Sequence, residues 1–288
     1  MPPMNGQPPT DHPATERPPL WVQSPPGVPV LSGVNWGGLK TLYIKEVRRF
    51  FKVQMQTVWA PAITTLLFLA IFTVALGRGG RTILGVPFAD FIGPGLIIMA
   101  MLQNAFANSS FSLLVGKMQG TIVDYLMPPL STGELIAGLV GAAVTRAVLV
   151  GFAVWLAMLL WPGVSVSIGN PFWLLWFGIL GALMLAFLGL MTSVWADKFD
   201  HAAAVTNFVV TPLSLLSGTF YAIDQLSPLF QTISHANPFF YVISGFRYGF
   251  IGVSDSPVLV GAGLLLVINI LLWWGCYALL RSGWKIKN

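Results

Sequence analysis

Charged side chains are scarce in this sequence of 288 residues: they make up 9% of it, whereas hydrophobic residues make up 55%. A soluble domain usually contains about 25% charged residues, so the composition excludes an ordinary water-soluble globule. Cysteine is almost absent, and the single Cys276 excludes an internal disulfide. The three histidines stand far apart in the sequence. They lack the spacing of a zinc-binding pair, so no metal site is expected.

Motifs for catalysis are missing as well. No G-x-x-x-x-G-K-[ST] occurs, because Gly116 and Lys117 are followed by Met118, so the chain lacks the loop that holds the phosphates of ATP. Neither G-x-S-x-G nor H-E-x-x-H is present, which disfavours a serine hydrolase and a metalloprotease. We therefore expect no enzyme activity and no cofactor on this chain.

Long runs without charge are abundant. About 20 apolar residues in a helix cross the hydrocarbon core of a bilayer, where ionisable side chains are costly. Four runs fit one helix each, and a longer run, 135–196, is divided into two by glycine and proline near its middle. The predicted spans lie near residues 58–77, 92–115, 135–161, 171–195, 202–222 and 257–280. The sequence thus predicts an all-α integral membrane protein with six transmembrane helices.

The distribution of positive charge predicts the orientation of these spans. Lys and Arg near helix ends are retained on the cytoplasmic side, and six spans place both termini on one side. Most of the 15 Lys and Arg fall on that side. We therefore expect a multi-pass protein of the plasma (inner) membrane with both termini in the cytoplasm. The net charge of +5 then reflects topology and contact with membrane lipids, and no nucleic acid is expected as a partner.

Two different segments precede the first span. Residues 1–35 are rich in proline, which predicts a disordered cytoplasmic tail that is either a linker or a site for a partner. Residues 36–55 have a helical period and predict an amphipathic helix on the membrane surface. Its basic face contains Lys45, Arg48, Arg49 and Lys52. Its apolar face contains Leu39, Tyr43, Val47 and Phe50. This helix either anchors the chain or transmits motion to the first span.

Polar residues recur at helical spacing inside two predicted spans. The second span contains Asn104, Asn108 and Ser112, and the fifth contains Asn207, Thr211 and Ser214. Such stripes avoid lipid, so they either bond to neighbouring helices or line a path open to water. Arg146 in the third span should face protein or water beside a partner that the sequence does not identify. One arginine alone is too little to predict a proton or ion relay.

The cytoplasmic loop 116–133 predicts a short helix. A T-x-x-D pattern formed by Thr121 and Asp124 marks its start, and Pro128 and Pro129 mark its end. It would present Ile122, Tyr125 and Leu126. The segment is either a tight connection or a knob that fits a cytoplasmic partner. A second pattern, S-x-x-E at 131–134, opens the third span.

The external loop 224–255 is too polar and too often broken for another span. Its many aromatic residues suit short helices that enter the outer membrane interface without crossing the bilayer. It includes the run NPFFYVISGFRYGFIG at 237–252.

The order of these parts resembles the half-size permease subunit of type-2 ATP-binding-cassette (ABC) exporters. The resemblance covers residues 36–288 as one permease domain and leaves the proline-rich tail outside. The NP-x-x-Y and GFRYG elements carry it most specifically. Their residues are Asn237, Pro238, Tyr241, Gly245, Arg247 and Tyr248.

The resemblance implies a homodimer or pseudo-dimer of permeases bound to two separate cytoplasmic ATPase subunits, which would hold the ATP and Mg. Residues 39–52 would be the family's connecting helix, 121–127 its coupling helix and 226–249 its external re-entrant helices. The coupling helix would contact the ATPase through Thr121, Ile122, Asp124, Tyr125 and Leu126. The implied function is export of a lipid-linked, polysaccharide or drug-like substrate.

Two alternatives remain open from the sequence. An ion-driven secondary transporter would depend on an ion gradient and often contains an inverted internal repeat, and none is evident here. A membrane assembly protein would show no substrate flux. Asn104, Asn108, Arg146, Asn207 and Thr211 are the candidates for either a transport path or helix packing.

Overall fold

Five helices are long and apolar enough to cross a membrane within the residues that the computed structural model describes, 33–76, 82–161 and 164–285. All belong to the unit Val34–Asn288. The first is formed by the π-helix η1 (Met55–Trp59) and α2 (Ala60–Leu76). The others are α3 (Phe88–Met118), α5 (Thr132–Leu159), α6 (Pro171–Trp195) and α11 (Val258–Ser282). An all-α membrane protein is therefore confirmed. Residues 1–32 of the predicted tail lie outside the described residues.

The fifth predicted span in chain order, 202–222, is shorter than expected. The helices α7 (Phe199–Val205), η2 (Thr206–Val210) and α8 (Thr211–Leu215) follow one another without a break, and η2 is a π-helix. Pro212 lacks a backbone N–H, and the wide turn before it accommodates the missing bond. The chain leaves the helix after Leu215, and Gly218 has a positive φ of 76°. A sixth crossing by this segment stays a prediction.

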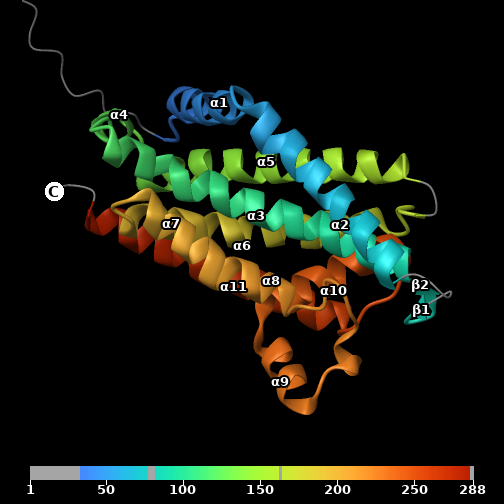
Figure 1. Cartoon of the computed structure of the whole chain (residues 1–288). Helices are drawn as coiled ribbons and strands as arrows, with labels where there is room; N and C mark the ends of the chain where they lie inside the picture. The colour runs from blue at the N-terminus through green and yellow to red at the C-terminus, as the bar shows by residue number, and fades with distance from the viewer. Residues whose placement is uncertain (1–32, 77–81, 162–163, 286–288) are drawn as a thin grey trace, which may run out of the picture. The chain divides into compact units, whose positions relative to one another are not determined.

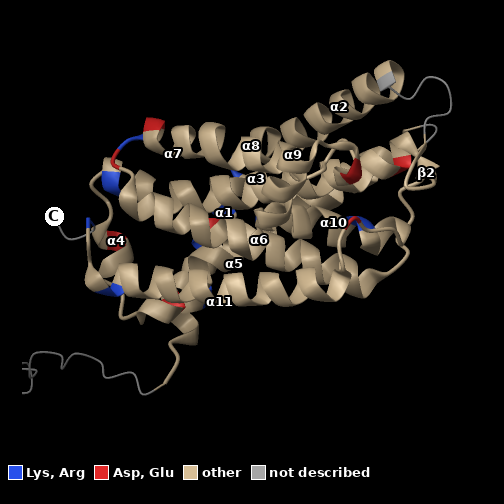
Figure 2. Cartoon of the chain, turned by 90° about the horizontal axis from the view of Figure 1, so that it is seen from below, with Lys and Arg blue, Asp and Glu red and all other residues tan. Residues whose placement is uncertain are grey.

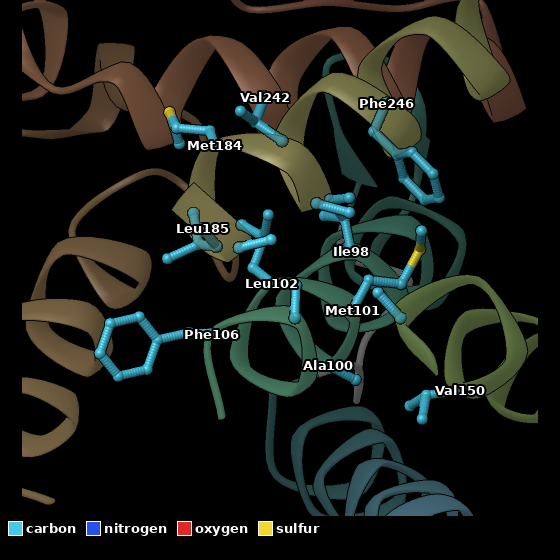
Figure 3. Close-up of a cluster of buried hydrophobic side chains, with 14 of the residues drawn as sticks. Ile98, Ala100, Met101, Leu102, Phe106, Val150, Met184, Leu185, Val242 and Phe246 are labelled. Atoms are coloured by element: carbon cyan, nitrogen blue, oxygen red, sulfur yellow. The ribbon is translucent and has the colours of Figure 1, made fainter. Parts of the chain in front are cut away.

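The centre of the fold is α3, which packs against α5 and α6 (Figure 1). The core cluster in Figure 3 joins Leu102 and Phe106 of α3 to Leu185 of α6 and to residues of α5 and α10. Gly189 permits a close approach of α6 to α3, since a Cβ there would lie 2.6 Å from the carbonyl oxygen of Phe106. The outer helices α2 and α11 instead expose many large apolar side chains. Such surfaces suit contact with lipid.

Charged residues gather toward the ends of the long helices, which are otherwise almost free of them (Figure 2). At one end, Lys117 and Lys285 both contact Asp197, at 3.5 and 2.8 Å. This three-residue contact ties the ends of α3, α6 and α11 together outside the apolar region.

Two short helices flank the end of α3 and the start of α5. The first, α1 (Trp36–Phe51), packs on α5 and is capped by Asn35, whose side chain accepts a bond from the Gly38 N–H. The second, α4 (Val123–Leu126), follows α3. The predicted T-x-x-D start of α4 is wrong: Ile122 precedes the helix and no side chain caps it. The predicted S-x-x-E start of α5 is confirmed, because Ser131 and Glu134 form a complete capping box.

The opposite end contains a hairpin and three short helices. The hairpin pairs β1 (Thr82–Ile83) with β2 (Val86–Pro87). The helices η3 (Ile223–Gln225), α9 (Pro228–Ala236) and α10 (Pro238–Ile251) lie in the segment where short external helices were expected. α10 packs against α3, α6 and α11. Its re-entrant placement in a bilayer stays a prediction.

Candidate functional site

A buried carboxylate, Glu46, connects α1 with α3 and α4. Its side chain is fully buried and forms an ion pair with Arg49 at 2.9 Å. Ser112 of α3 donates a hydrogen bond to its Oε2 at 3.0 Å, and Tyr125 of α4 donates one to its Oε1 at 3.0 Å. We call Glu46, Arg49, Ser112 and Tyr125 the Glu46 cluster. Three elements that are distant in sequence are thereby held at one carboxylate.

Arg49 points into the protein, so its prediction as part of the basic face of α1 is wrong. Its Nη2 donates to the carbonyl oxygen of Asn108 and to the hydroxyl of Ser112, both at 2.9 Å. Glu46, one turn earlier, explains why the Arg49 side chain points inward. A charge that leaves water is stable only beside an opposite charge and hydrogen-bond partners. Glu46 was not among the residues predicted from the sequence. The available signal was its position between Leu42 and Phe50, which are buried on the same face of α1.

Tyr125 also points inward, which corrects its prediction as part of an exposed knob. Its ring is buried beneath the ammonium group of Lys45, 3.7 Å from the ring centroid. Burial, and then the adjacent Glu46, raise the pKa of the Tyr125 hydroxyl above its usual value. Within 121–127 the exposed residues are Thr121, Val123, Asp124, Leu126 and Met127, and Ile122 is half-buried. Tyr125 therefore anchors α4 from within and leaves the opposite side free.

Arg146 of α5 lies beside Asn104 of α3, the partner that the sequence could not identify. Its Nη2 donates to the Asn104 Oδ1 at 2.8 Å, and the Asn104 Nδ2 donates to the carbonyl oxygen of Ala100. Its Nε is buried and has no hydrogen-bond partner among the described residues. We call Arg146 and Asn104 the Arg146 pair.

A cavity of about 300 Å³ lies between α2 and α3 and reaches Asn104. Its polar lining consists of Gln56, Thr64, Thr65, Gln103 and Asn104, and its apolar lining consists of Ala60, Pro61, Phe68, Leu96, Met99 and Ala100. The polar stripe of α3 thus divides: Asn108 and Ser112 contact Arg49, whereas Asn104 faces both Arg146 and the cavity.

The second polar stripe is not part of this lining. Asn207 is exposed and Thr211 is half-buried. Ser214 is buried and donates to the carbonyl oxygen of Val210 in its own helix. The structure therefore does not bring these residues to Asn104.

The run at 237–252 forms a second buried polar centre, around Arg247. This side chain is fully buried and pairs with Asp255 at 2.6 Å, and it donates to the carbonyl oxygens of Gly218 and Phe91. Burial raises the pKa of the Asp255 carboxyl, and Arg247 opposes that rise. Sequence reasoning placed Arg247 among the external charges and missed Asp255. Arg247 joins α10 to α3 and to the turn after α8.

The other residues of this run fix α10 in place. Asn237 caps the helix at Phe239 N and donates from Nδ2 to Leu213 O and Ser217 Oγ. Pro238 is its first residue. The Tyr241 hydroxyl donates to the carbonyl oxygen of His235. A Cβ at Gly245 would meet the ring of Phe177, so this glycine permits contact with α6. Tyr248 is half-buried.

Comparison with known proteins places these features in a family context. A family model described as ABC-2 type transporter matches residues 38–251. The chain is 36% identical over 261 residues to the inner membrane transport permease YadH of Escherichia coli (strain K12), covering 88% of this chain and 98% of YadH. It is 26% identical over 261 residues to nodulation protein J of Rhizobium leguminosarum bv. viciae, covering 86% and 95%. Nodulation protein J of Neorhizobium galegae is 25% identical over 221 residues, covering 73% and 82%.

Proposed function

This chain belongs to the ABC-2 type transporter family as a permease subunit, and from that premise we propose that it is the membrane half of an exporter driven by ATP hydrolysis on a separate subunit. It is a multi-pass protein of the inner membrane. The proposed orientation has both termini in the cytoplasm. The proposed assembly is a homodimer in contact with membrane lipids, with ATP and Mg held by the ATPase. The substrate would be lipid-linked, polysaccharide or drug-like.

The observation that carries this proposal is the attachment of α4 to α1 and α3 through the Glu46 cluster. The inner side of α4 is fixed by Tyr125, while Asp124, Leu126 and Met127 are exposed, Met127 at 79%. An exposed apolar and acidic surface on a firmly attached short helix suits contact with a second protein. Thr121, Ile122, Asp124 and Leu126 would contact the ATPase, and Tyr125 would hold the helix behind them.

The same contacts offer a physical route from α4 to the cavity. Glu46 binds Tyr125, Arg49 and Ser112, and Asn104 lies two turns before Ser112 on α3. Displacement of α4 by the ATPase would therefore move α1 and α3 together and change the wall of the cavity. Asn104, Asn108 and Arg146 would act along this route. Asn207 and Thr211 would serve either the transport path or helix packing.

Capture of the ATPase tests the proposal. The chain is purified in mild detergent with its co-expressed ATPase, as wild type and as the double variant D124R/L126R. We expect the variant to lose the ATPase while its spans stay folded, because the exposed side of α4 is disrupted. D224R is the matched control, since Asp224 is also exposed but lies in the predicted external segment. Full transport without nucleotide, or transport driven by an ion gradient alone, would overturn the proposal.

A further inference from the structure

Arg146 carries a positive charge without a counterion among the described residues. No carboxylate of residues 33–76, 82–161 and 164–285 lies within ion-pair distance of it. Its one hydrogen bond goes to the neutral amide of Asn104. Because charge inside a membrane span is costly unless it is paired or functional, this arrangement needs an explanation.

The other enclosed arginines of the described chain are neutralised. Arg49 pairs with Glu46 at 2.9 Å, and Arg247 pairs with Asp255 at 2.6 Å. Each therefore has the carboxylate that stabilises a buried guanidinium. Arg146 differs from both, and the difference points to an anion that is not part of the described residues.

The cavity between α2 and α3 is suited to that anion. Arg146 is not among the residues that line it, but Asn104 both contacts Arg146 and lines the cavity, so the guanidinium lies behind one wall residue. Hydroxyl and amide groups of Thr64, Thr65 and Gln103 line the same space and can donate hydrogen bonds to phosphate or carboxylate oxygens. Phe68, Leu96 and Met99 add apolar surface for an alkyl chain. The volume of about 300 Å³ is at the lower end of the range for small-molecule pockets.

We propose that this cavity binds the anionic group, phosphate or carboxylate, of an amphipathic molecule, and that Arg146 supplies the counter-charge beside Asn104. The inference rests on the proposed export function and makes the substrate, or a lipid that accompanies it, anionic. A positive charge in a site of low dielectric attracts an anion more strongly than it would in water. An uncharged analogue would gain affinity only from contact with the apolar surface of the cavity.

Binding of two probes tests the inference without the ATPase. The full chain is placed in phosphatidylcholine nanodiscs and titrated with decyl phosphate and with uncharged decyl glucoside. We expect wild type to prefer decyl phosphate by about tenfold, because the charge of Arg146 attracts the phosphate and has no such effect on the uncharged probe. R146Q should lose this preference and R146K should retain part of it. R281Q is the matched control, because Arg281 is an exposed arginine at the end of α11, and it should bind as wild type does.

A second variant keeps the charge and removes the space. Thr64 is exposed and lines the cavity, so T64W should fold, fill the cavity and weaken binding of both probes. An unchanged preference in R146Q, or unchanged binding in T64W, would overturn the inference. A chain that binds decyl phosphate in this manner but associates with no ATPase would refute the export function and leave the anion site intact.

The source of the anion is distinguished by adding phosphatidylglycerol to the nanodiscs. Competition with decyl phosphate in wild type, absent in R146Q, would identify a bilayer lipid as the occupant. Unchanged decyl phosphate binding in wild type would identify an amphiphile other than the bulk anionic lipid. Both results support an anion site at Arg146.

Discussion

The Glu46 cluster and the Arg146 pair both place a guanidinium against α3, but they differ in charge balance. Arg49 has a carboxylate at 2.9 Å and three further hydrogen bonds to α3, to two oxygens of Asn108 and to the hydroxyl of Ser112. Arg146 has one neutral amide. A cluster whose charges are paired holds elements together, whereas an unpaired charge near a cavity is available to a ligand. The difference teaches that one polar stripe on α3 serves attachment at one end and recognition at the other.

The largest effect is expected from E46Q, which breaks the attachment. It leaves Arg49 without a carboxylate and weakens the bond from Tyr125. Loss of one partner of a buried ion pair costs about 3–5 kcal/mol, and because the Arg49 side chain is 29% exposed we expect about 2 kcal/mol. The measurement is the free energy of unfolding in mixed detergent micelles. D124N, which removes an exposed carboxylate, is the control, and equal stability of E46Q and wild type would contradict the assigned role of Glu46.

A smaller effect is expected from Y125F, which removes one hydroxyl and keeps the ring beneath Lys45. The lost bond to a carboxylate should cost about 1.5 kcal/mol. In a double-mutant cycle with E46Q the two losses should be less than additive, because Y125F removes a contact that E46Q has already weakened. ATP hydrolysis by the assembled complex should become less dependent on the permease. Additive losses would show that Tyr125 and Glu46 act independently.

R146Q should change the free energy of unfolding less than E46Q or Y125F does. This result would sharpen the comparison between the Glu46 cluster and the Arg146 pair. Its charge has no carboxylate partner in the described chain, so removing it should alter the free energy of unfolding by less than about 1 kcal/mol. R49Q, made in parallel, should cost more because it leaves Glu46 buried and unpaired. The same unfolding measurement decides the order. A larger loss in R146Q than in R49Q would show that Arg146 is a structural residue.

The exposed contact of Asp197 with Lys117 and Lys285 can be compared with the two buried sites, the Glu46 cluster and the Arg146 pair. The hydrogen bond from Lys285, with the charges of Lys285 and Lys117, lowers the pKa of the Asp197 carboxyl. A lowered pKa in the folded state gives stability above the unfolded pKa, and this stability is lost as pH falls through the folded value. We expect this loss of stability to be small in the wild type and absent in D197N. Thermal unfolding below pH 4 measures it. If D197N lost as much stability at low pH as the wild type does, the loss would come from another titrating group.

The helices were predictable because their signals are local. Runs without charge located the five long helices, and Ser131 with Glu134 marked the start of α5. The fifth span was overestimated because apolar composition continues past Leu215, whereas the backbone turns at Gly218.

The site was less predictable because its contacts join distant segments. Asn104 and Arg146 are on different helices, and periodicity does not state which helices are neighbours. Glu46 was hidden among basic residues of an amphipathic helix, and only the buried positions of Leu42 and Phe50 on its face indicate its direction. Arg247 looked like a loop charge because Asp255, its partner, lies beyond the end of α10.

Cross-linking from α4 tests the central claim, that a separate ATPase acts on this permease, most directly. Cys276 is buried and is the single cysteine of the chain, so an introduced cysteine is a selective probe. Met127→Cys is placed on the exposed side next to α4, and Leu229→Cys on α9 is the control, with native exposures of 79% and 68%. The account predicts that Met127→Cys cross-links to the ATPase with a yield that changes when ATP is added, and that Leu229→Cys does not. Cross-linking from Leu229→Cys alone, or from neither position in an active complex, would contradict it.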